Sequence, residues 1–72
     1  MLREMRARRL ELMEKTLEIV EKAGKPVSIY YVAFHLRVAW HVARALLFEL
    51  VIKGKLKVID TSKGYLFARG DV

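Results

Sequence analysis

The chain has 72 residues, enough for one domain near the lower size at which a single apolar core can hold a fold. It contains no cysteine, which excludes disulfides, thiolate metal sites and catalysis by a thiol. Fourteen lysine and arginine residues against eight acidic ones leave a formal charge of +6, which favours partners that carry negative charge.

The first predicted element is one long helix from Leu2 to Ala23. Its apolar residues recur on one half of the helical wheel, and most of its charged residues fall on the other half. Gly24 and Pro26 end it, because glycine caps the end of a helix and proline cannot continue one. We expect core packing to begin near Leu10.

Residues 1–9 are predicted to form a basic helical overhang ahead of a core domain of residues 10–69. The apolar stripe is interrupted there by arginines on the side that also carries Leu2 and Met5. The arginines of the overhang are Arg3, Arg6, Arg8 and Arg9. Two interpretations stay open: a frayed terminus, or an arm that contacts phosphate or a second subunit.

Two shorter helices are predicted next. A short extended piece leads to Ser28, whose hydroxyl is well placed to cap a helix that begins at Ile29. A third helix is predicted from about Trp40 to Lys53, and Gly54 ends it.

The last part of the chain is predicted to be a β-hairpin, because the apolar period changes there from 3.6 to 2. Its strands are Leu56–Asp60 and Tyr65–Arg69, joined by a turn over residues 61–64 in which Gly64 is free to take a positive φ. The fold class is therefore α+β, with three helices, of which the first is long, and a C-terminal hairpin.

The segment from Val32 to Leu56 resembles the winged helix-turn-helix superfamily of archaeal and bacterial transcription regulators. The small Ala33 lets two helices cross closely, and Val38 plugs the turn between them. Leu50 is followed four residues later by Gly54 at the start of the hairpin, which forms the wing in this family. The resemblance implies that residues 1–72 form a single winged-helix domain.

The resemblance covers the chain from about Leu10 to Arg69, with two departures. The family often has glycine where Arg37 stands, and serine or threonine where Ala39 stands. Both the tight turn and the cap of the third helix are therefore expected to be weaker in this chain.

In this family the third helix usually enters the major groove of DNA, while the wing lies along the backbone or the minor groove. The resemblance thus implies double-stranded DNA binding, by a transcription regulator or a nucleoid-associated protein. The implied DNA-contacting residues are Arg37, Trp40, His41, Arg44, Ala45, Lys55, Lys57 and Lys63. Arg44 is expected to read guanine through a bidentate pair, and the lysines are expected to contact phosphates.

An apolar strip on the third helix fits two interpretations: packing beneath the hairpin, or a protein interface. The interface candidates are Leu2, Met5, Leu12, Phe48 and Ile52. A homodimer would suit both the small core and a two-fold DNA site. Two other functions stay open: a winged-helix module that binds another protein, and an RNA-binding protein that stacks bases on Tyr65 and Phe67 if these face outward.

No catalytic residue, metal site, cofactor or small-molecule substrate is predicted, and the protein is not expected to be an enzyme. His35 and His41 lie on different helices, while Ser28 and Ser62 suit a cap and a turn. The sequence lacks both a membrane span and a secretory signal, so we expect a cytoplasmic protein. The absence of asparagine and glutamine favours a thermophilic, archaeal source.

Overall fold

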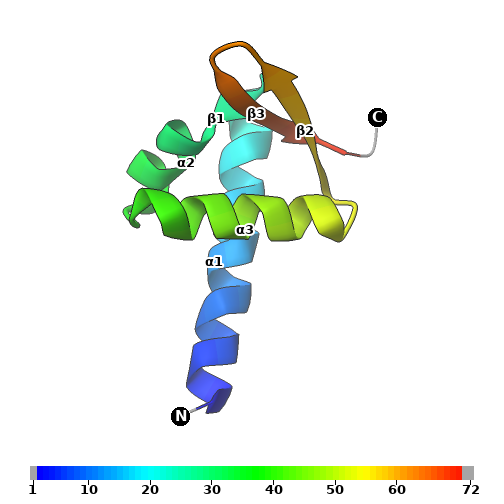
Figure 1. Cartoon of the computed structure of the whole chain (residues 1–72). Helices are drawn as coiled ribbons and strands as arrows, with labels where there is room; N and C mark the ends of the chain where they lie inside the picture. Colours follow the sequence, from blue (N-terminus) through cyan, green and yellow to red (C-terminus); the bar gives the residue numbers. More distant parts are fainter. Residues whose placement is uncertain (1, 71–72) are drawn as a thin grey trace.

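The computed structural model of the chain describes residues 2–70, with side chains from residue 7 onward. The helices are α1 (Leu2–Ala23), α2 (Ile29–Leu36) and α3 (Trp40–Ile52), and the strands are β1 (Val27–Ser28), β2 (Leu56–Thr61) and β3 (Gly64–Arg69) (Figure 1). The strands form one antiparallel sheet in the order β1-β3-β2. The predicted α+β class, the three helices and the long first helix are confirmed, and the arrangement is compatible with a winged-helix-like fold.

The hairpin of β2 and β3 is tighter at its turn than the sequence pattern indicated. Thr61 pairs with Gly64, so both strands extend one residue further than predicted. Gly64 has a φ of +120°, which agrees with the prediction of a positive φ at this glycine. The Thr61 hydroxyl donates to the Gly64 carbonyl oxygen at 2.6 Å and accepts from the Lys63 amide at 3.2 Å, which fixes the turn.

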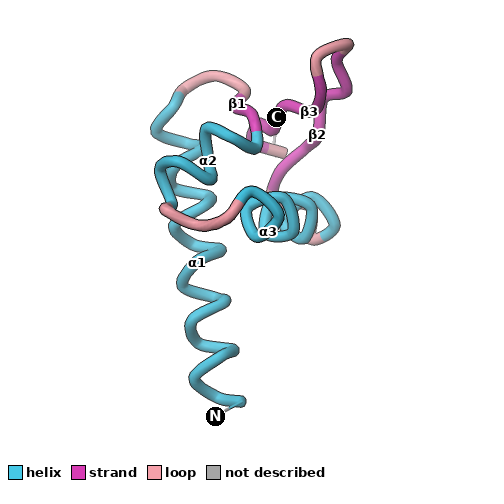
Figure 2. The backbone as a smooth tube through the Cα atoms, turned by 60° about the vertical axis from the view of Figure 1, so that its left-hand side comes forward, coloured by secondary structure: helices cyan, strands magenta, loops and turns pink. Residues whose placement is uncertain are grey.

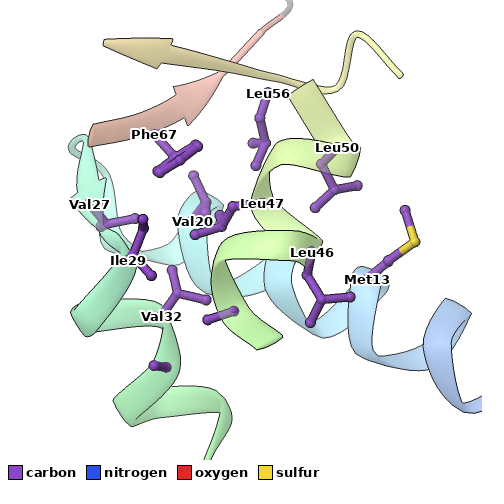
Figure 3. Packing of buried hydrophobic residues seen from close by; sticks show 12 residues of the cluster. Met13, Val20, Val27, Ile29, Val32, Leu46, Leu47, Leu50, Leu56 and Phe67 are labelled. Carbon is purple, nitrogen blue, oxygen red and sulfur yellow. The ribbon is translucent and has the colours of Figure 1, made fainter. Parts of the chain in front are cut away.

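The core lies where the three helices meet the inner face of the sheet (Figure 3). Phe67 of β3 is fully buried, and its ring meets Phe48 of α3 edge to face with centroids 5.2 Å apart. The other buried apolar residues are Met13, Val20, Val27, Ile29, Val32, Ala33, Ala43, Leu46, Leu47, Leu50 and Leu56. Each large side chain of this kind stabilises the fold by about 1.5–3 kcal/mol relative to an exposed position.

Core packing on α1 begins at Leu12 and Met13, two to three residues later than the position near Leu10 that the sequence suggested. Leu10 is 55 % exposed, whereas Met13 is 6 % exposed. Helix α1 continues well past its crossing with α3, and the hairpin stands on the other side of α3 (Figures 1 and 2). The apolar stripe therefore extends further along α1 than the elements that cover it.

The turn between α2 and α3 has the two weaknesses that the sequence predicts. Arg37 takes the left-handed conformation, with φ 59° and ψ 47°, which costs a residue other than glycine about 1–2 kcal/mol. Ala39 occupies the N-cap of α3 and makes no side-chain hydrogen bond there. By contrast, the Ser28 hydroxyl accepts a hydrogen bond from the Tyr31 amide at 3.1 Å and caps α2 as expected.

Candidate functional site

A cleft of about 200 Å³ opens between the first turns of α2 and α3 and the tip of the hairpin. We call it the aromatic cleft, and its lining residues are Ser28, Ile29, Tyr30, Trp40, Arg44, Lys63, Gly64 and Tyr65. Of the residues predicted from the sequence to contact DNA, the cleft brings together Trp40, Arg44 and Lys63.

Two aromatic side chains of α2 are exposed, and the first of them, Tyr30, lines the cleft. Tyr30 is 73 % exposed, and Phe34, one helical turn further along, is 78 % exposed. The ring of Tyr30 lies 6.0 Å from that of Trp40, which is 42 % exposed at the start of α3. We call Tyr30, Phe34 and Trp40 the aromatic face. It forms because the buried side of α2 is taken by Ile29, Val32 and Ala33, so residues on the opposite side of the helix point outward.

Two positively charged side chains border the cleft. The Arg44 guanidinium lies 5.0 Å from the centroid of the Phe48 ring, and this ring packs edge to face on Tyr65 with centroids 5.5 Å apart. Such a cation–π contact restrains the arginine without neutralising its charge. Lys63 lies in the hairpin turn and is exposed. Among the described side chains, neither Arg44 nor Lys63 forms an ion pair.

The other two predicted lysines, Lys55 and Lys57, lie on a different surface. Lys57 pairs with Ala68, whereas the next pair along the strands, Val58 with the buried Phe67, points to the opposite face of the sheet. Side chains alternate between the faces of a strand, so Lys57 points away from α3. It lines a depression of about 280 Å³ beside the end of α1, and Lys55 lines a neighbouring one of about 270 Å³.

The surface around Lys55 and Lys57 also carries an acidic side chain. Glu21 of α1 lines both depressions, and its carboxylate lies 3.5 Å from the Arg69 guanidinium. Elsewhere on α1, ion pairs join Glu11 with Lys15 and Glu18 with Lys22. Glu21 thus offsets part of the positive charge of this surface, which also holds Lys25, whereas no carboxylate lines the aromatic cleft.

Arg9 of the predicted basic overhang is engaged within the chain. Its Nε donates to Glu49 Oε1 at 3.0 Å, its Nη2 contacts the same oxygen, and Lys53 Nζ lies 3.6 Å from Glu49 Oε2. Chiefly because Arg9 donates to this carboxylate, the pKa of Glu49 is lowered, against the opposing effect of desolvation. The side chains of Arg3 and Arg6 lie outside those that the structure describes.

No family model matches the chain, and no curated protein matches it. A solved structure does: human N-acetylserotonin methyltransferase in complex with SAM, with a TM-score of 0.75 and 23 % sequence identity. The fold is shared with part of an enzyme. The match covers 85 % of this chain but 17 % of the methyltransferase chain, so the chain spans about a sixth of that enzyme's length. At this identity the likeness establishes the fold alone.

This comparison overturns the prediction that the chain is a DNA-binding regulator. The prediction depended on a fold attributed to transcription regulators. A fold of this shape also occurs within a methyltransferase, which is an enzyme, so the fold does not by itself indicate DNA binding. The geometry removes a second support, because Lys55 and Lys57 lie away from the surface that holds Arg44 and Lys63. The cations that were predicted to contact DNA from α3 and from the hairpin are therefore divided between two sides of the molecule.

The other predicted site residues differ in exposure. Arg37, His41 and Ala45 are exposed, the first in the turn and the others on α3. Among the interface candidates, Ile52 is 84 % exposed at the end of α3, whereas Leu12 is half-buried against the core. Phe48 is half-buried beneath the hairpin, which favours the packing interpretation for this residue. The side chains of Leu2 and Met5 lie outside the described part of the chain.

Sequence reasoning missed Tyr30 and Phe34. The signal was available, because these aromatics are spaced i, i+4 and fall between the apolar positions that mark the buried side of α2. The RNA-binding alternative drawn from the sequence used Phe67 for base stacking, but this ring is fully buried and cannot serve that role.

The two histidines remain apart in the structure. His35 packs against the rings of Tyr31 and Phe34, with centroids 4.3 Å and 5.4 Å away, whereas His41 is exposed on α3. Within the described chain, no three histidine, aspartate or glutamate side chains are grouped so that they could hold a metal ion. Over residues 2–70, no helix has both the length and the apolar character that crossing a membrane requires.

Proposed function

We propose that this chain is a winged-helix domain that binds another protein through the aromatic face of α2 and α3. The observation that carries the proposal is the exposure of Tyr30 and Phe34 on α2, at 73 % and 78 %, together with the contact between the Tyr30 and Trp40 rings. Single exposed apolar residues are common on protein surfaces, but neighbouring large aromatics are typical of binding sites.

The energetics of aromatic burial support a protein partner. Burying a large apolar side chain contributes about 1.5–3 kcal/mol, and tyrosine, tryptophan and phenylalanine are enriched in protein interfaces. The two α2 aromatics contribute little of this to the fold, because most of their surface remains in water. A partner that covers these two side chains would gain the free energy of burying them.

The fold comparison is compatible with such a role. In the similar methyltransferase structure the matched region is 17 % of the chain, so there a unit of this shape is part of a larger protein. We propose that the domain in this chain associates with another protein surface and is not itself an enzyme.

A photo-crosslinking phenylalanine analogue placed at position 34 tests the proposal. The protein is added to an extract of its source organism, illuminated, and analysed by mass spectrometry, with the same analogue at position 57 as a matched control. We expect a defined protein adduct from position 34, which Tyr30→Ala reduces, and no such adduct from position 57. Equal adducts from both positions, or adducts to nucleic acid from position 34, would overturn the proposal.

A further inference from the structure

We infer that the aromatic cleft binds an acidic segment of a partner protein, with one apolar side chain inserted between Tyr30, Trp40 and Tyr65. The carboxylates of this segment would lie against Arg44 and Lys63. The inference rests on the proposed function, since it names the chemistry of the partner at the same surface.

The size of the cleft suits a single side chain. Pockets that hold small molecules measure about 300–1,000 Å³, whereas this cleft measures about 200 Å³. Three aromatic rings from α2, α3 and β3 contribute to its lining, so an aromatic or branched aliphatic side chain would exchange water for apolar contact on several sides. The apolar part of the partner is therefore expected to be one anchor residue.

The charges at the cleft favour a partner that carries negative charge. Both charged lining residues, Arg44 and Lys63, are positive, and the whole chain carries a formal charge of +6. Asp60 is cross-strand to Tyr65, but it does not line the cleft. Because Phe48 already restrains the Arg44 guanidinium, less side-chain entropy is lost when a carboxylate pairs with it.

The same charges disfavour the two other occupants that an aromatic, basic surface suggests. In a two-fold dimer the same patch meets itself, so a second copy on this cleft would bring Arg44 and Lys63 close to their own counterparts. A nucleic acid strand needs cations spaced along its backbone, but Lys55 and Lys57 lie on the other surface. An acidic peptide segment satisfies two cations and one apolar cleft without further contacts.

The single tryptophan of the chain lies in the cleft, so its fluorescence reports on this site directly. The probe is a synthetic peptide in which glutamates flank one central phenylalanine. We expect it to change the Trp40 emission in a saturable way, and to bind more weakly as salt is added. Peptides with a central alanine, or with lysines in place of glutamates, are expected to bind at least about fivefold more weakly, the factor that ~1 kcal/mol gives.

Variants assign the binding to the cleft. Arg44→Ala and Lys63→Ala are each expected to raise the dissociation constant about two- to fivefold, and the double variant about tenfold or more, as for exposed charge pairs. Lys57→Ala is the matched control, since it removes the same charge from the other surface and should leave the dissociation constant unchanged. An equal loss in Lys57→Ala would mean that net charge alone attracts the peptide, and would overturn the inference.

Three other results would also overturn it: equal binding of the alanine-centred peptide, tighter binding of single-stranded RNA of the same length, or a Trp40 emission that changes on dilution together with a dimer in sedimentation. Failure of this inference can be told apart from failure of the proposed function. If position 34 still gives its specific protein adduct while the acidic peptide shows no preference, only the partner chemistry is wrong.

Discussion

Phe67 of β3 and Phe34 of α2 are the same residue type in opposite surroundings. Phe67 is fully buried against Phe48, in the space between sheet and helices, whereas Phe34 is 78 % exposed and meets only the neighbouring His35 among the described aromatic rings. The fold depends on the first and leaves the second uncovered. The aromatics of this chain thus divide into one group that holds the domain together and one that is available to a partner.

Truncation of these two residues gives the largest expected difference. Phe67→Ala should lower the free energy of unfolding by about 3–5 kcal/mol, because it removes apolar contacts and leaves a cavity. Phe34→Ala should change it by no more than about 0.5 kcal/mol, as for surface positions generally. Guanidinium unfolding followed by circular dichroism measures both. Similar losses from the two variants would remove the division between structural and available aromatics.

Much of this architecture could be predicted from the sequence, because it depends on local signals. Gly24 and Pro26 end α1, Ser28 caps α2, and the change of apolar period marks the hairpin. These features act over a few residues and need no knowledge of distant contacts. The α+β class followed from them directly.

The candidate site could not be predicted in the same way, because it depends on which elements cover one another. Lys57 and Lys63 belong to the same hairpin, yet the register and the turn place them on different surfaces. Leu10 continues the apolar stripe of α1, but it remains 55 % exposed. Phe34 and Phe67 differ in burial for the same reason. Sequence periodicity shows which side of an element is apolar, but it does not show how much of that element its neighbours cover.

The turn before Trp40 offers a way to stabilise the domain without touching its aromatic face. Ala39→Ser should raise the free energy of unfolding by about 1 kcal/mol, because a serine hydroxyl at the N-cap accepts a backbone amide of α3 that Ala39 leaves without a side-chain partner. Ala45→Ser, at an exposed position within the same helix, is the control and should lower stability slightly. A gain in both variants would show that the cap is not the cause.

Arg37 allows a related but smaller test. Arg37→Gly should raise the free energy of unfolding by about 0.5–1 kcal/mol, because glycine adopts the left-handed conformation without strain but loses more backbone entropy on folding. Arg37→Ala removes the same charge and keeps the strain, so it should be close to neutral. If the alanine variant gained as much as the glycine variant, repulsion among cations and not backbone strain would explain the effect.

The smallest expected effect lies on α3 away from the cleft, where Arg9 lowers the pKa of Glu49. A carboxyl whose pKa is lower in the folded state stabilises the fold above its unfolded pKa of about 4.3, and this contribution disappears as the pH falls through the folded value. Glu49→Gln should therefore lower the melting temperature slightly at about pH 7 and leave it unchanged in strong acid, at low salt to limit screening. Glu14→Gln, at an exposed position without an ion pair among the described side chains, provides the comparison. A Glu49→Gln deficit that grows toward acid pH would contradict the assignment of the Arg9 contact, and Arg9 would then become available to a partner as Arg44 and Lys63 are.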